Sequence, residues 1–337
     1  MKSVIRTAAG GPEVLQLVER PVPEPGPGEV RVRVRVSGVN PTDWRSRRRP
    51  LPPGMDEQVP HQDGAGVIDA VGPRVDPGRV GERVWIWEAA WERPWGTAQQ
   101  YTLVSDRHAV ALPDHAPFEL GAALGVPALT AHRALTVRDG GPGRIAPSTL
   151  QGATVLVAGG AGAVGNAAIQ LARWAGARVI TTVSSPAKAA LARAAGAHLV
   201  VDYRTQDATA EILAFAREGV DIVVEVAPGA NAALDIAVAA PGAVVAYYSG
   251  SEDEQLSVPV LSSLAANLRW QSVYVYTVPP AVKQQAITDV AAAVGAGALR
   301  VGEETGLPLH RFALEHTSDA HAALERGVVG KVLLDIP

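Results

Sequence analysis

The chain contains no cysteine among its 337 residues. This absence excludes disulfide bonds, cysteine nucleophiles and every zinc site built on thiolates. Long apolar runs are missing as well: none reaches the roughly 18 uninterrupted residues that a membrane-spanning helix needs. The opening MKSVIRTAAGG also lacks the apolar stretch of a signal peptide. We therefore expect a cytoplasmic protein with no membrane partner.

An excess of positive charge is also absent, because the formal net charge is −4. The one dense basic run, RSRRR at 45–49, is typical of a solvated loop, so we do not expect nucleic acid as a partner. Hydrophobic residues make up 47% of the chain and charged residues 19%, which is typical of a globular protein. The length suits two domains.

The first part of the chain has the pattern of short, half-buried strands. In EVRVRVRV, valines at 30, 32, 34 and 36 alternate with arginines. Further short apolar runs, GAGVIDAVG, GERVWIW and AQQYTLV, are separated by glycine and proline turns. We predict a small, mostly antiparallel β domain over residues 1–126.

From Pro127 onward, apolar strands alternate with helices, which we expect at 163–175, 186–195 and 208–217. This pattern indicates a doubly wound parallel sheet covered on both faces, an α/β fold, over residues 127–276. The last strand of that sheet is predicted as WQSVYVYT at 270–277. Residues 277–337 would begin with a helix and return a final strand, VVGKVLLDIP, to the first domain.

A glycine-rich stretch predicts a dinucleotide site. Gly160, Gly162 and Gly165 form G-x-G-x-x-G after a strand and at the start of a helix, with Ala163 and Val164 inside the motif. In this context backbone N–H groups and the helix N-terminus face a pyrophosphate.

The second strand of the same unit predicts which dinucleotide is bound. An NAD-preferring site usually has an acidic residue at the end of this strand, where this chain has a valine followed by Ser184 and Ser185. Lys188 lies one helical turn beyond, and Tyr203 follows the third strand. These groups favour the 2′-phosphate of NADPH, although Lys188 and Tyr203 could also be ordinary surface residues.

Several motifs occur in a family-specific order: GVNPTDWR, HQDGAGVIDAVG, VPALTAHRAL, AGGAGAVG, TVSSPAKAALARAAGA, VDYR and GKVLLDI. Together they resemble the zinc-independent quinone oxidoreductase branch, zeta-crystallin-like, of the medium-chain dehydrogenase/reductase superfamily. The resemblance implies a GroES-like catalytic domain built from both chain ends, a central Rossmann domain and an active-site cleft between them. It also implies a homodimer in which WQSVYVYT pairs with its symmetry mate.

The resemblance further bears on metals. In the alcohol dehydrogenase branch of the superfamily, cysteine and histidine ligands of a catalytic zinc stand where this chain has Asn40 and Gln62. Neither side chain is a credible zinc ligand, so the resemblance implies a metal-free enzyme. His61, one position away, is then a cleft-lining or structural histidine; the alternative is a displaced metal ligand.

The family's catalytic residues can be carried over by position. The resemblance implies that Asn40 lies beside the nicotinamide and substrate and that Thr130 lies near the nicotinamide. Asp43 either orients its neighbours or caps a turn. Relatives often carry a tyrosine shortly after this aspartate, where this chain has Trp44 and Arg45, so the proton donor is left open.

Further contacts follow from the same resemblance. Ser249 and Gly250 would contact the phosphate side of the cofactor, and Gly330 and Lys331 its nicotinamide end. Tryptophans cluster in VWIWEAAWERPWG: at least one of those in the strand is expected in the core. Trp91 and Trp95, with Trp44 and His61, would shape a pocket for a flat, conjugated substrate.

Without a metal, the chemistry favours particular substrates. Hydride added to a quinone or an α,β-unsaturated carbonyl gives a delocalised anion that weak hydrogen bonds can support, whereas a simple ketone requires a Lewis acid or a strong proton donor. The sequence therefore predicts an NADPH-dependent quinone or enone oxidoreductase. The alternatives are an enoyl-thioester reductase of the same superfamily and a non-catalytic NADPH-binding protein.

Overall fold

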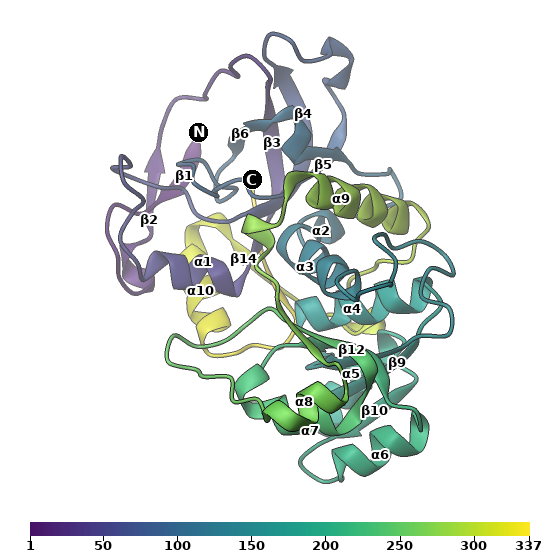
Figure 1. The fold of residues 1–337 in the computed structure, drawn as a ribbon. Coiled ribbons are helices and arrows are strands. Elements are labelled where there is room, and N and C mark those ends of the chain that lie inside the picture. The colour runs from purple at the N-terminus through teal and green to yellow at the C-terminus, as the bar shows by residue number, and fades with distance from the viewer. The chain divides into compact units, whose positions relative to one another are not determined.

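A computed structural model describes residues 1–337, which form two compact units. The first unit contains residues 1–126 and 308–337, and the second contains residues 127–307. Figure 1 labels the helices and strands of both. Helix α3 (Gly125–Leu135) starts at the end of the first unit's N-terminal part and continues into the second. None of the helices is both long and apolar enough to cross a bilayer.

The first unit is mostly β, as predicted. Its main sheet has the order β14-β15-β3-β4-β5-β7, with β6 also paired to β3, and all pairs are antiparallel except β14 with β15. The strands of this sheet are β3 (Glu29–Val39), β4 (Asp63–Val71), β5 (Arg83–Ile86), β6 (Tyr101–Ser105), β7 (Ala109–Ala111), β14 (Leu309–Ala313) and β15 (Lys331–Asp335). The unit also contains the hairpin β1 (Lys2–Ile5) and β2 (Gln16–Glu19) and the helices α1 (Pro41–Arg47), α2 (Phe118–Gly121) and α10 (Thr317–Glu325).

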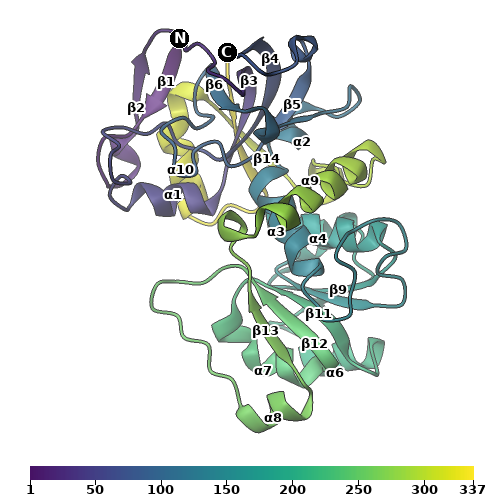
Figure 2. The same cartoon turned by 45° about the horizontal axis from the view of Figure 1, so that its top comes forward.

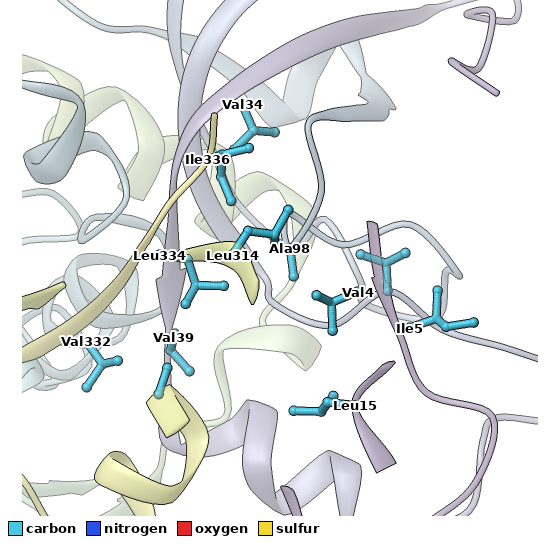
Figure 3. Close-up of a cluster of buried hydrophobic side chains, with 12 residues drawn as sticks. Val4, Ile5, Leu15, Val34, Val39, Ala98, Leu314, Val332, Leu334 and Ile336 are labelled. Carbon is cyan, nitrogen blue, oxygen red and sulfur yellow. The ribbon is translucent and has the colours of Figure 1, made fainter. Parts of the chain in front are cut away.

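The core of the first unit joins both ends of the chain. On β3 the valines predicted to face inward are 0–4% exposed. Figure 3 shows Val34 and Val39 of β3 beside Val332, Leu334 and Ile336 from the chain's C-terminus, with Val4 and Ile5 from its N-terminus. The C-terminal strand therefore returns to the first unit, because its alternate apolar side chains complete this core.

The second unit is a six-stranded parallel sheet with the order β10-β9-β8-β11-β12-β13, the doubly wound Rossmann order. Figure 2 shows β11, β12 and β13 side by side. The strands are β8 (Thr154–Ala158), β9 (Arg178–Val183), β10 (Leu199–Asp202), β11 (Val220–Glu225), β12 (Ala239–Tyr247) and β13 (Arg269–Ser272). The helices are α4 (Ala163–Trp174), α5 (Pro186–Ala194), α6 (Ala208–Phe215), α7 (Pro228–Val238), α8 (Val260–Ala265) and α9 (Pro280–Gly295).

Residues 277–307 belong to the second unit, whereas the sequence predicted them in the segment that returns to the first. Buried polar contacts explain the difference. Asp289 of α9 accepts hydrogen bonds from His132 Nε2, at 2.8 Å, and from the backbone N–H of Ile145, at 2.7 Å. These long-range partners attach α9 to the second unit, and no local pattern in the sequence indicates them.

The last parallel strand is also shorter than predicted. WQSVYVYT was expected to be one strand over 270–277, but β13 ends at Ser272 and residues Val275–Thr277 form a 3₁₀ turn. A backbone hydrogen bond closes this turn, because Thr277 N–H donates to Tyr274 O at 3.1 Å. Pro279 and Pro280 follow, and proline has no N–H to extend a ladder, so the chain starts α9 instead.

Candidate functional site

The glycine-rich turn after β8 has the geometry of a phosphate loop. Gly159 has φ +72°, which completes the tight turn. A Cβ on Gly160 would lie 2.2 Å from Thr181 Oγ1, and one on Gly165 would lie 2.4 Å from Gly159 O. These two glycines therefore allow close packing. Gly162, the N-cap of α4, is exposed, and a Cβ there would meet only Gly159 O, at 3.4 Å.

The different roles of these glycines fit a dinucleotide-binding site. The open face at Gly162 lets a ligand approach the backbone at the N-terminus of α4, while the tight positions hold the turn against β9 and α4. Ala163 and Val164, also predicted to touch the cofactor, form the half-buried first residues of that helix. The sequence motif included Gly160, Gly162 and Gly165 but missed Gly159, whose backbone angle only the structure shows.

The end of β9 carries the groups predicted to select the cofactor. Val183 is buried, and the carboxylate common in NAD-preferring sites is absent at this position. Ser185 caps α5 by accepting a hydrogen bond from Lys188 N–H, and the Lys188 ammonium donates to Ser184 Oγ at 2.9 Å. Tyr203 lies nearby, since its N–H donates to Val183 O, and its side chain is 54% exposed.

The end of β12 completes the same edge of the sheet. Ser249 and Gly250 lie two and three residues after Tyr247, the end of β12, and are half-buried. Beyond them, the Glu254 carboxylate accepts hydrogen bonds from the backbone N–H groups of Gly229 and Ser251, at 2.9 and 3.0 Å. The loop after β12 is thereby fixed to the start of α7.

A buried carboxyl pair at the end of β11 was not predicted from sequence. Glu225 and Asp235 are both fully buried. One Glu225 oxygen accepts from Ala227 N–H and Asn231 Nδ2, but the other Glu225 oxygen and both Asp235 oxygens have no hydrogen-bond donor. Burial, followed by the Glu225 charge, raises the pKa of Asp235 to about 9. Asp235 therefore holds a proton near neutral pH.

In the first unit, Asn40 belongs to a buried polar network that also contains Asp63 and Lys331. Asn40 Nδ2 donates to Asp63 Oδ2 at 2.7 Å, and the Lys331 ammonium donates to Asn40 Oδ1 at 2.6 Å. Lys331 Nζ also lies 3.8 Å from Asp63 Oδ2. All three side chains are at most 2% exposed. Burial raises the pKa of Asp63 and lowers that of Lys331, while their mutual attraction opposes both shifts.

Asp63 is the residue of this network that sequence reasoning missed. Its signal is a carboxylate directly before the glycine-rich start of a strand, in HQDGAG. Lys331, predicted as a cofactor contact, directs its ammonium to Asn40 and Asp63. The preceding Gly330 has φ +117°, and a Cβ there would lie 2.2 Å from Pro308 O, so this position requires glycine for backbone reasons.

Asp43 acts as a helix cap. Its carboxylate accepts the backbone N–H of Asn40, the N-cap of α1, at 2.7 Å. Burial raises the pKa of Asp43 to about 8, and the neighbouring Asp63 charge contributes in the same direction. Of the two interpretations offered by the sequence, the turn-capping one describes what this side chain contacts in the structure.

His61 is part of a directed chain of hydrogen bonds. Arg47 can only donate, so its contact of 3.0 Å makes His321 Nδ1 an acceptor and leaves the proton on His321 Nε2. That proton is donated to His61 Nε2, 2.8 Å away, and His61 Nδ1 then donates to Ser37 Oγ at 2.9 Å. Burial lowers the pKa of His61 well below its usual value and that of His321 to about 3, so both rings are neutral.

The same chain continues to the backbone of Asp63. Ser37 Oγ lies 2.7 Å from Thr97 Oγ1, which donates to Asp63 O at 2.6 Å. The protonated Nε2 of His321 has no lone pair for a metal, and the Nε2 lone pair of His61 accepts the hydrogen bond from His321. Both ring nitrogens of His61 thus make hydrogen bonds within the protein, and no group of three or more histidine, aspartate or glutamate side chains gathers in metal-binding geometry.

The remaining predicted residues have different surroundings. The Trp44 ring lies 5.5 Å from the Arg45 guanidinium and 5.2 Å from that of Arg48, and Trp95 packs on the core cluster of Figure 3 with Arg20 over its ring. Trp85 is fully buried and Trp91 is half-buried in the loop after β5. Thr130 is buried on α3 in the second unit.

Comparison with known proteins gives consistent matches. The family described as alcohol dehydrogenase GroES-like domain matches residues 26–114, and the family described as zinc-binding dehydrogenase matches residues 163–292. The quinone oxidoreductase of Homo sapiens is 29% identical over 343 residues, covering 99% of this chain and 97% of its own length.

Solved structures agree with this result. A mycobacterial protein crystallised in complex with NADPH has a TM-score of 0.80 and 28% identity, with 99% of both chains covered. A structure described as an NAD-dependent alcohol dehydrogenase has a TM-score of 0.84 and 29% identity over the whole of both chains. With its Rossmann sheet, its mostly β unit built from both chain ends and these relatives, the chain belongs to the quinone oxidoreductase branch of the medium-chain dehydrogenase/reductase superfamily.

Proposed function

We propose that this protein is an NADPH-dependent, metal-free oxidoreductase that reduces a quinone or an α,β-unsaturated carbonyl. The observation that carries the proposal is the nucleotide-binding edge of the second unit. There the open Gly162 backbone at the N-terminus of α4 lies beside a strand end that has Ser184, Ser185 and Lys188 in place of a carboxylate. The NADPH complex of a mycobacterial relative supports the same choice of cofactor.

Bound NADPH would supply a hydride from its nicotinamide ring, and the protein would hold the cofactor and the acceptor in place. Ser184, Ser185 and Lys188 provide hydroxyl groups and an ammonium for the 2′-phosphate, and the first turn of α4 provides backbone N–H groups for the pyrophosphate. Tyr203, Ser249 and Gly250 are proposed as further contacts along the same edge. We propose that Asn40, Thr130, Gly330 and Lys331 serve the nicotinamide and substrate side.

Conjugated acceptors suit a site without a Lewis acid, because the developing anion is delocalised. The similarity to proteins named quinone oxidoreductase favours a quinone over an enoyl thioester as the acceptor that we propose for this protein. The test is NADPH oxidation measured with naphthoquinones, alkenals and enoyl thioesters. Turnover confined to enoyl thioesters would favour the reductase alternative, and tight NADPH binding without oxidation by any acceptor would favour a non-catalytic protein.

Lys188→Ala should weaken NADPH binding by about ten-fold and leave NADH binding unchanged, because a charge-assisted bond to the 2′-phosphate contributes about 1.5–3 kcal/mol. The measurement is the KM of each coenzyme. Arg193→Ala, which removes an exposed charge from the last turn of the same helix, is the matched control. Equal losses for both coenzymes, or a wild-type enzyme that prefers NADH, would contradict the assignment.

We also propose a homodimer that forms at the β13 edge of the second unit. β13 is the last strand in the sheet order, so its outer backbone groups have no strand partner within the sheet. The short helix α8 before it exposes Val260, Leu261 and Leu264, which are 65–81% accessible. Exposed apolar side chains beside an open sheet edge are typical of an interface.

Leu261→Asp combined with Leu264→Asp should convert the dimer to a monomer in sedimentation velocity, since each buried leucine contributes about 1.5–3 kcal/mol to an interface. Leu17→Asp, which alters an exposed leucine of β2 in the first unit, should leave the dimer intact. A wild-type protein that sediments as a monomer would exclude this interface.

A further inference from the structure

We infer that Asp63 is a positioning residue that fixes the Asn40 amide, so that Asn40 presents an N–H donor to an electronegative oxygen of the acceptor. The inference rests on the proposed function, which places Asn40 beside the acceptor. It adds that Asp63 orients the Asn40 side chain and that Asn40 acts there as a hydrogen-bond donor.

The orientation of the Asn40 amide follows from the chemistry of its two neighbours. Lys331 has only donors, so the Asn40 atom 2.6 Å from its ammonium must be the carbonyl oxygen Oδ1. The Asn40 atom 2.7 Å from Asp63 Oδ2 must then be Nδ2, which donates one of its two N–H groups. The second N–H of Nδ2 is the donor that the amide has left for a ligand.

Asp63 can impose this orientation because it is itself held rigidly. Both of its carboxylate oxygens lie 3.0 Å from the backbone N–H of Val126, in the first turn of α3. A Cβ on Gly125 would lie 2.1 Å from Asp63 Oδ1, so a glycine is required where the helix start meets the carboxylate. The backbone of Asp63 is fixed as well, since its carbonyl ends the hydrogen-bond chain through Thr97.

The charges of Asp63 and Lys331 also favour a donor role for the Asn40 amide. The Asp63 carboxylate lies 3.8 Å from the Lys331 ammonium, and an ammonium that is fully buried needs a counter-charge. With Asp63 ionised, Lys331 stays charged and continues to occupy Asn40 Oδ1. An N–H donor with an ammonium behind it stabilises negative charge on an oxygen, which suits the carbonyl oxygen of a quinone or enone as it receives hydride density.

Asp63→Asn tests this directly, because it keeps the shape of the side chain and removes its charge. We expect kcat with a naphthoquinone to fall by about ten-fold or more, while the Kd of NADPH, whose phosphates we place on the second unit, changes by less than about two-fold. Asp69→Asn is the matched control: it is the same change on the same strand and breaks a partly exposed contact to Arg31. Its kcat should equal that of the wild type.

The exchanged pair Asn40→Asp with Asp63→Asn separates orientation from folding. It keeps one carboxylate, one amide and Lys331 together, so its melting temperature should lie closer to the wild-type value than that of either single variant. Its kcat should stay low, because an ionised aspartate at position 40 would have no N–H to offer. Restored kcat in the exchanged pair, or wild-type kcat in folded Asp63→Asn, would overturn the inference.

Two further outcomes also decide the matter. Equal losses of kcat and NADPH affinity in Asp63→Asn would show a general structural role and contradict positioning. If the wild type reduces no acceptor, the proposed function fails by itself, and the melting temperatures still test the network: additive losses in the exchanged pair, or failure of that pair to fold, would contradict it.

Discussion

Gly162→Val should weaken NADPH binding by about 100-fold or more, equivalent to about 2.7 kcal/mol, without lowering the melting temperature. Gly162 has φ −83° and ψ 164°, a conformation that valine adopts readily. The new side chain would extend into the open space over the N-terminus of α4, where we place the pyrophosphate. Coenzyme affinity can be measured by the fluorescence of bound NADPH.

Gly165→Val provides the contrast, because the same change three residues further along should destabilise the second unit and lower its melting temperature. A Cβ at Gly165 would lie 2.4 Å from Gly159 O and 3.0 Å from Gly159 C, and these backbone atoms cannot move without opening the turn. The cost of such overpacking is about 3 kcal/mol or more. Tight NADPH binding by Gly162→Val, or loss of stability in both variants alike, would show that the dinucleotide does not approach at Gly162.

Asp235→Asn should stabilise the protein, and the gain should grow with pH to about 2–3 kcal/mol near pH 9. In the wild type, Asp235 holds a buried proton near neutral pH, and neither its two oxygens nor the second Glu225 oxygen has a hydrogen-bond donor. An asparagine amide would donate an N–H to the free Glu225 oxygen and would need no proton. Urea unfolding at a series of pH values gives the free energy of unfolding for both proteins.

The direction of the pH effect follows from the pKa of Asp235. Burial raises this pKa to about 9 in the folded protein, against an ordinary value of 3.8. Since the folded state holds a proton that the unfolded state releases above about pH 4, wild-type stability should fall as the pH rises from about 4 toward 9. Below about pH 4 both states are protonated, so the stability lost at higher pH is fully present there.

Asp253→Asn is the matched control for this prediction, because Asp253 is an exposed aspartate of the same unit. It should shift the free energy of unfolding by no more than about 0.5 kcal/mol at any pH. A loss of stability in Asp235→Asn, or a gain that is the same at low and high pH, would exclude a raised pKa of Asp235.

The sequence alone predicted the features that depend on local patterns. Alternating valines predicted β3, and apolar strands alternating with helices predicted the doubly wound sheet. The spacing of Gly160, Gly162 and Gly165 predicted the phosphate loop, because a turn that starts a helix is specified by neighbouring residues. The motifs in order also indicated the superfamily branch, which the comparisons confirmed.

Only the tertiary structure decided which distant side chains meet. Nothing near Asp63 indicates that Asn40 and Lys331, 23 and 268 positions away in the chain (63 − 40 and 331 − 63), converge on its carboxylate. The sequence could not predict two other features for the same reason: the carboxyl pair of Glu225 and Asp235, and the attachment of α9 through Asp289. Burial and donor geometry arise from packing between segments far apart in sequence, and they set the pKa values and orientations on which the proposed chemistry depends.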